Sequence, residues 1–127
     1  MQQWLWVGIG GFVGANLRFF ISQAAHQWFV VAGFPVGTFL VNMIGCLCIG
    51  ALAACAAYFD WLSEQIRLLL MVGLLGSLTT FSTFGLDSIQ LIKQQAWFYL
   101  VLNVGGQVVF GLLLVWLGYY LVTLLSH

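Results

Sequence analysis

The sequence predicts an all-α membrane protein with four transmembrane helices, and three observations support this prediction. Of its 127 residues, 63% are hydrophobic and only 5% are charged, whereas about a quarter of the residues in a soluble domain are charged. The charges leave long uncharged stretches at 1–17, 19–59, 68–86 and 94–127, and one span needs about 20 apolar residues. Trp and Tyr residues fall close to the ends of these stretches, where aromatic rings prefer the headgroup layer. One four-helix transmembrane domain is therefore expected over residues 1–127.

Turn-forming and polar residues mark the ends of each expected helix. Gly33-Phe34-Pro35 separates the first helix from the second, because proline suits the first turn of a helix. The polar connection from Asp60 to Arg67 leads into the third helix, and Lys93-Gln94-Gln95 ends it. Helices are thus expected from near Trp4 to the high twenties, from near Pro35 to Tyr58, from about Ile66 to Lys93, and from near Trp97 to about Thr123.

The loop charges do not favour either orientation in the membrane. With four spans, Arg67 lies on the side of the termini and Lys93 on the other side, so the positive-inside rule gives no bias. Insertion in both orientations would allow an antiparallel homodimer with its two-fold axis in the membrane plane. Four helices pack around side chains and leave no room for an aqueous path. Transport by so short a chain would therefore use a subunit interface.

The most unusual segment runs from Gly73 to Gly85, in the middle of the third span. Five of the seven residues from Ser77 to Thr83 carry hydroxyl groups, and glycines flank them. Continuous helix is poorly favoured there, and irregular backbone at bilayer depth is tolerated where it is buried in protein or lines a cavity. The segment indicates either a broken helix with an ion site or a kinked helix whose hydroxyls bond the preceding turn.

Further candidates for an ion path come from the first three spans. Phe81 and Phe84 could present positive ring edges to a small anion, or could be ordinary core or lipid-facing residues. Asn42, with Thr38 one turn earlier, could donate to an anion or bond a neighbouring helix. Arg18 could attract anions or extend to the headgroups.

Three polar residues in the second half of the chain each allow more than one role. Asn103 and Gln107 lie one turn apart and either continue a polar track or join helices. Asp87 could cap a helix, pair with Lys93 or line a pore mouth.

The G-x-x-x-G motif of Gly10 and Gly14 in the first helix favours close helix packing.

Several classes of function are disfavoured. No His, Cys or carboxylate pair lies together at membrane depth, so an enzyme is not expected. Net charge near zero without a basic cluster argues against nucleic acid as a partner. Cys46, Cys48 and Cys55 lack metal-ligand spacing and read as packing residues.

Three stretches resemble successive motifs of the Fluc (CrcB) fluoride channels. They run from Gly10 to Arg18, from Gly37 to Cys46 and from Gly73 to Phe84, and the string TTFSTF is the most specific. The resemblance covers essentially the whole chain. It implies dual-topology antiparallel homodimers with two pores, each lined by both subunits. Such channels pass fluoride out of the cytoplasm passively, so a multi-pass protein of the bacterial plasma membrane is implied.

The resemblance also implies roles for individual residues. Phe81 and Phe84 match the aromatic pair of the pore, Asn42 the pore asparagine, and Arg18 the arginine of the first helix. Polar-track positions match Thr38, Ser82 and Thr83. Gly76 and Thr79 match positions whose backbone carbonyls hold a structural sodium ion on the dimer axis. Asp87 stands where the family tends to have Glu, and Asn103 where some members have a polar aromatic residue.

Fluoride selectivity agrees with these residue types, since a dry pore must replace tightly held water with dense donors. The alternatives are a proton-coupled small-ion transporter of the four-helix dual-topology type, with Asp87 its only candidate carrier, a multidrug exporter of the same build, and a non-transporting assembly subunit. An exporter of that kind needs a carboxylate in the first helix, and none precedes Asp60.

Overall fold

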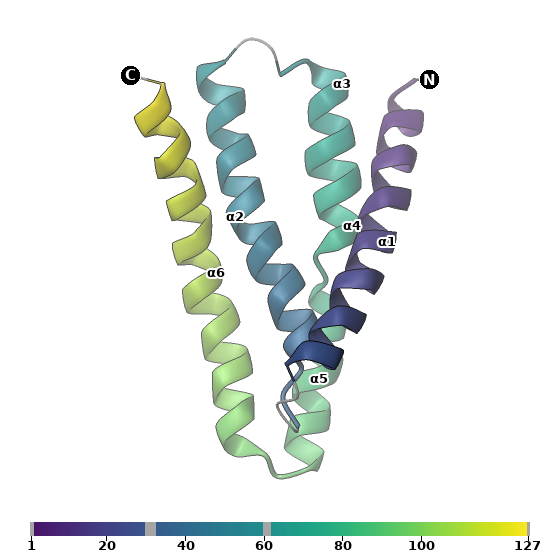
Figure 1. Ribbon diagram of the computed structural model, residues 1–127, viewed down its shortest axis with the longest axis vertical. Helices are drawn as coiled ribbons and strands as arrows, with labels where there is room; N and C mark the ends of the chain where they lie inside the picture. The colour runs from purple at the N-terminus through teal and green to yellow at the C-terminus, as the bar shows by residue number, and fades with distance from the viewer. Residues whose placement is uncertain (1, 30–32, 60–61, 127) are drawn as a thin grey trace.

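The computed structural model describes residues 2–29, 33–59 and 62–126. In this part of the chain, four helical spans are long and apolar enough to cross a membrane (Figure 1). The predicted all-helical class and the four spans are therefore confirmed. Asp60, at the start of the predicted polar connection, lies outside the described residues. The elements are α1 (Gln3–Trp28), α2 (Val36–Tyr58), α3 (Glu64–Arg67), η1 (Leu68–Leu75), α4 (Gly76–Leu78), α5 (Phe81–Lys93) and α6 (Trp97–Leu125).

The helix ends follow the predicted turn chemistry closely. Pro35 precedes the first residue of α2 as its N-cap, one position earlier than a first-turn proline. Gly33 has a φ of 90°, a backbone conformation that glycine adopts without a steric penalty. The side chain of Ser63 accepts a hydrogen bond from the N–H of Ile66 and caps α3.

The spans associate as two close pairs, α1 with η1 and α2 with α6. Both termini lie at the end of the molecule that also carries the α2–α3 connection, and the two pairs move apart toward that end (Figure 1). Arg67 lies at this end and Lys93 near the opposite one, as the sequence predicts.

Glycines allow each pair to approach backbone to backbone. A β-carbon at Gly10 or Gly14 would overlap backbone atoms of Leu69 or Leu74 in η1, which confirms the close packing predicted for the G-x-x-x-G motif. The α2–α6 pair uses the same device, since a β-carbon at Gly118 would overlap the carbonyl of Leu47. The positions of the spans are thus fixed by backbone contacts.

The third span contains two residues in extended conformation. Thr79 has φ −79° and ψ 156°, and Thr80 has φ −152° and ψ 118°. We call these two residues the extended pair. On the N-terminal side, Leu68–Leu75 forms a π-helix, which the sequence did not predict. The N–H of Thr79 still donates to the carbonyl of Leu75 at 3.1 Å, and the N–H of Thr80 is the first that leaves the helical pattern.

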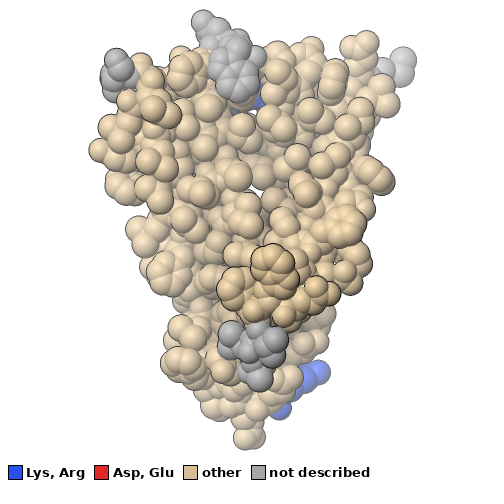
Figure 2. All heavy atoms as spheres, in the orientation of Figure 1, with Lys and Arg blue, Asp and Glu red and all other residues tan. Residues whose placement is uncertain are grey.

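Uncharged side chains cover most of the surface. Figure 2 shows one face that is almost entirely uncharged, with Lys or Arg atoms visible only toward its two ends. Large apolar residues on the outer sides of α1 and α6, such as Phe12 and Leu112, are exposed, as lipid contact requires.

Candidate functional site

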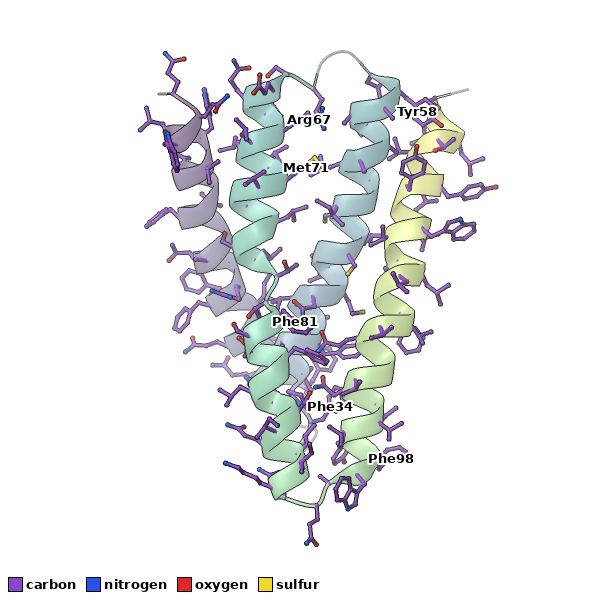
Figure 3. The ribbon with its side chains drawn as sticks, turned by 180° about the vertical axis from the view of Figure 1, so that it is seen from behind. Phe34, Tyr58, Arg67, Met71, Phe81 and Phe98 are labelled. Carbon is purple, nitrogen blue, oxygen red and sulfur yellow. The ribbon has the colours of Figure 1, made fainter. Side chains whose placement is uncertain are left out.

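A groove of about 440 Å³ lies between α2, the third span and α6, around the extended pair. We call it the interhelical groove. Met71 lies on its side of η1, and Phe81 lies where α5 begins (Figure 3). Its lining is mainly apolar, with a few polar groups brought together at the extended pair. The lining residues are Asn42, Met43, Gly45, Cys46, Ile49, Met71, Leu75, Gly76, Thr79, Thr80, Phe81, Phe84, Gln107 and Val108.

The predicted aromatic pair lies together in this groove. The ring centroids of Phe81 and Phe84 are 5.4 Å apart, and their planes make an angle of 47°. Phe81 is 82% exposed, which is high for a residue in the middle of the molecule. Both rings line the groove, and the edges of aromatic rings carry partial positive charge.

Asn42 holds both backbone groups of Thr80. Its Oδ1 accepts from the Thr80 N–H at 2.8 Å, and its Nδ2 donates to the Thr80 carbonyl at 3.1 Å. A flipped amide would place oxygen against oxygen and N–H against N–H, so these two contacts fix its orientation. The side chain thus replaces hydrogen bonds that Thr80 would make in a continuous helix.

The same amide begins a row of hydrogen-bonded side chains. Asn42 Nδ2 also donates to Gln107 Oε1 at 2.6 Å, and Gln107 Nε2 donates to Asn103 Oδ1 at 3.0 Å. Asn103 Nδ2 donates to Ser88 Oγ at 3.1 Å, and Ser88 donates to the Phe84 carbonyl at 2.8 Å. We call these four side chains the amide array. Asn103 is fully buried, so its amide depends on these partners.

The carbonyls of Gly76 and Thr79 are among those that lose their helical donors at the extended pair. The Thr80 N–H would reach the carbonyl of Gly76 in a continuous helix, but it goes to Asn42 instead. The Thr83 N–H likewise goes to Thr80 Oγ1 at 3.2 Å and not to the carbonyl of Thr79. Gly76 and Thr79 are the two residues predicted to offer carbonyls to a sodium ion, and both line the interhelical groove.

The hydroxyl groups next to the extended pair form a small cluster. Thr80 Oγ1 lies 2.9 Å from Thr83 Oγ1 and 3.2 Å from Ser82 Oγ. The hydroxyls of Ser77 and Thr79 bond back to carbonyls of the preceding turn, as the kinked-helix alternative expects. The segment therefore combines such back-bonding with extended backbone.

A second, more polar pocket of about 530 Å³ lies closer to the α5–α6 end. It contains the predicted polar-track residues Thr38 and Thr83, together with Asp87. The Oδ2 of Asp87 is buried without a hydrogen-bond partner, so Lys93 does not bond to it. This pocket is also lined by three residues that the sequence did not indicate, His26, Gln90 and Gln94.

Most of the predicted site residues therefore fall into two groups, and Ser82 and Arg18 lie outside both. The interhelical groove contains Asn42, Gly76, Thr79, Phe81 and Phe84, and the polar pocket contains Thr38 and Thr83. The hydroxyl of Ser82 contacts that of Thr80, which lines the groove. Arg18, on α1, is among the lining residues of neither space. Ser88 completes the amide array, and only its spacing of one turn from Phe84 could have indicated it.

Comparisons with known proteins identify the family of this chain. The family model described as "CrcB-like protein, Camphor Resistance (CrcB)" matches residues 5–119. The chain belongs to the CrcB-like family. A member from Methylobacillus flagellatus, named "Fluoride-specific ion channel FluC", is 39% identical over 96% of this chain and 95% of its own length. Proteins of the same name from Chloroflexus aurantiacus and Aeromonas salmonicida are 43% and 42% identical, over 93% and 96% of this chain and 93% and 97% of their own lengths.

Family membership and the four apolar spans together make this a multi-pass membrane protein. The resemblance stated on three short motifs is confirmed over most of the chain.

Proposed function

We propose that this CrcB-like protein is a fluoride-selective ion channel. The observation that carries the proposal is the interhelical groove, where the phenylalanine pair, the Thr80 hydroxyl and two side-chain amides meet at bilayer depth. Relatives about 40% identical over most of the chain are named fluoride-specific channels. A channel performs no covalent chemistry, in keeping with the expectation that this protein is not an enzyme.

Fluoride binds water tightly, so its path must offer many weak donors and no trapping charge. Ring edges of Phe81 and Phe84 provide partial positive charge, and the hydroxyls of Thr80, Ser82 and Thr83 can rotate to donate. In our proposal the ion moves between the groove and the polar pocket along these groups, past Thr83, which lines the pocket. Arg18 acts at a distance, by attracting anions to the entrance.

The proposed assembly is a homodimer of two copies inserted in opposite orientations, with two pores at the interface. A single copy leaves Phe81 and the groove open, and a second copy is the occupant that would cover them. The even distribution of Arg67 and Lys93 between the two ends supports insertion both ways. The partners of the chain are therefore a second copy of itself, fluoride and the lipid bilayer.

We propose a structural sodium ion at the dimer axis. The carbonyls of Gly76 and Thr79 have lost their helical donors, and neutral oxygens of this kind suit a hard cation. In the proposed dimer each copy contributes these two carbonyls, so the ion would join the two copies. Its function there is to hold the subunits together by neutralising the partial charges of the four carbonyls.

The resemblance also leads us to propose the plasma membrane of a bacterium as the location and passive export of toxic fluoride from the cytoplasm as the physiological function. Passive flow suffices for export, because the potential across the membrane drives an anion outward.

Flux from liposomes tests this function. Purified protein is reconstituted into vesicles loaded with potassium fluoride or potassium chloride, and anion efflux is recorded with an ion-selective electrode after valinomycin is added. We expect fluoride release without chloride release. If folded protein releases no fluoride, the channel proposal is refuted.

The runner-up, a proton-coupled transporter, is separated from a channel by one further addition. A protonophore added with valinomycin should leave fluoride efflux unchanged in a channel. Coupled transport through Asp87 would instead need the protonophore, and Asp87→Asn would abolish it.

A further inference from the structure

We propose that Asn103 and Gln107 are positioning residues for the ion path. Their side chains hold the Asn42 amide in the one orientation that keeps the Thr80 backbone extended. This inference rests on the proposed function for its consequence, but its structural part can be tested separately.

The direction of every hydrogen bond in the amide array is determined at its two ends. The Thr80 N–H can only donate, so it requires the oxygen of Asn42, and the Phe84 carbonyl can only accept, so it requires the Ser88 hydroxyl. Between these ends each amide accepts from one neighbour and donates to the next. No member can turn over without leaving buried polar groups unpaired, and Asn103 is fully buried.

The array also occupies the hydrogen-bond donors of Asn42. Both N–H groups of Asn42 are used, one by the Thr80 carbonyl and one by Gln107. Gln107 accepts from Asn42 and donates to Asn103, so both of its contacts in the array hold neighbouring amides in place. Asn42 therefore acts by holding the backbone of Thr80, and Gln107 acts through Asn42.

The loss of this support should loosen the extended pair. Gln107→Met keeps the length of the side chain and removes its polar atoms, so the Asn42 amide loses its Gln107 acceptor. Asn103→Leu removes the next link. Because a hydrogen bond contributes a free energy equivalent to about a three- to tenfold change in an equilibrium constant, either variant should populate open conformations of Thr80 about that much more often.

Hydrogen exchange at Thr80 measures this opening directly. Protein labelled with ¹⁵N-threonine gives five backbone signals, and Thr123, inside α6, serves as an internal reference. We expect the Thr80 N–H to exchange about three to ten times faster in Gln107→Met and faster still in Asn42→Ala. Gln65→Met, which removes an exposed amide on α3, is the matched control and should change nothing. Unchanged exchange in Gln107→Met, with faster exchange in Asn42→Ala, would overturn the proposal.

A double-mutant cycle on fluoride efflux tests the functional consequence. If Gln107 acts through Asn42, Gln107→Met should slow efflux about three- to tenfold alone and have no further effect in an Asn42→Ala background. Additive effects would show that Gln107 acts independently and would refute the positioning role. If the wild-type protein conducts no fluoride, the proposed function fails, while the exchange experiment still decides the structural part. Should Asn103→Leu fail to fold, Ser88→Ala, with Ser88→Thr as its rescue, tests the same row of bonds.

Discussion

Two alanine substitutions in α1, at Gly14 and at Gly11, test how closely this helix approaches η1. At Gly14, a β-carbon would lie 2.9 Å from the carbonyl carbon of Leu74 and overlap the carbonyl oxygen. Ordinary contacts between heavy atoms are about 3.5–4.0 Å, so the two helices would have to separate by about 1 Å. At Gly11, in the same helix, a β-carbon would meet nothing within 4 Å.

The expected free energies follow from these distances. Alanine is favoured over glycine in a helix by about 1 kcal/mol at either position. Overpacking at Gly14 costs about 1–3 kcal/mol, because the obstructing carbonyl of Leu74 is backbone and cannot rotate away. Gly14→Ala should therefore be neutral to destabilising by about 2 kcal/mol, while Gly11→Ala should stabilise by up to about 1 kcal/mol. The difference between the two variants is about 1–3 kcal/mol.

Equilibrium unfolding in mixed micelles measures this difference. Increasing mole fractions of sodium dodecyl sulfate unfold the protein, and the fluorescence of its six tryptophans reports the transition. Gly8→Ala is a second control, since its β-carbon would also meet nothing within 4 Å. Equal midpoints for Gly14→Ala and Gly11→Ala would refute the backbone contact between α1 and η1.

Three further outcomes are expected. Phe81→Ile should slow fluoride efflux from liposomes about tenfold or more. Phe12→Ile, on the exposed side of α1, is the control and should leave the rate unchanged. Similar efflux rates for both variants would show that fluoride passage does not depend on the Phe81 ring. Thr80→Val should lower the free energy of unfolding by about 1 kcal/mol, because the cap on the Thr83 N–H is lost, and Thr80→Ser should retain it; the same micelle assay compares them. Replacing sodium with N-methylglucamine should lower the thermal midpoint of the protein through loss of the ion proposed at Gly76 and Thr79, and a midpoint independent of sodium would count against that ion.

The spans could be predicted because each depends on local signals. Long uncharged stretches require helices in lipid, and Gly33, Pro35 and Lys93 mark the ends within a few residues. The hydroxyl-rich segment also pointed to irregular backbone, since Ser and Thr compete with helical hydrogen bonds. The phenylalanine pair was placed by its spacing in the chain and by family resemblance.

The contacts that organise the site could not be predicted in this way. Asn42 and Thr80 are 38 residues apart, and nothing near either residue indicates that the amide meets the backbone of the other. The π-helix of η1 has no composition that distinguishes it from any other apolar helix. Arg18 was expected near the ion path from its charge and from family resemblance, but it is among the lining residues of neither the groove nor the polar pocket.

The chemistry of the amide array has a consequence for the energy supply of the cell. Protons cross membranes along rows of hydrogen-bonded groups only if each group can accept a proton on one side and release another. Side-chain amides do not exchange protons in this way at neutral pH, since their N–H groups stay bound and their oxygens are very weak bases. Asn42, Gln107 and Asn103 thus form a row of hydrogen bonds that a proton cannot follow. The amide row therefore gives protons no route of its own, and it does not discharge the proton gradient from which the cell draws energy.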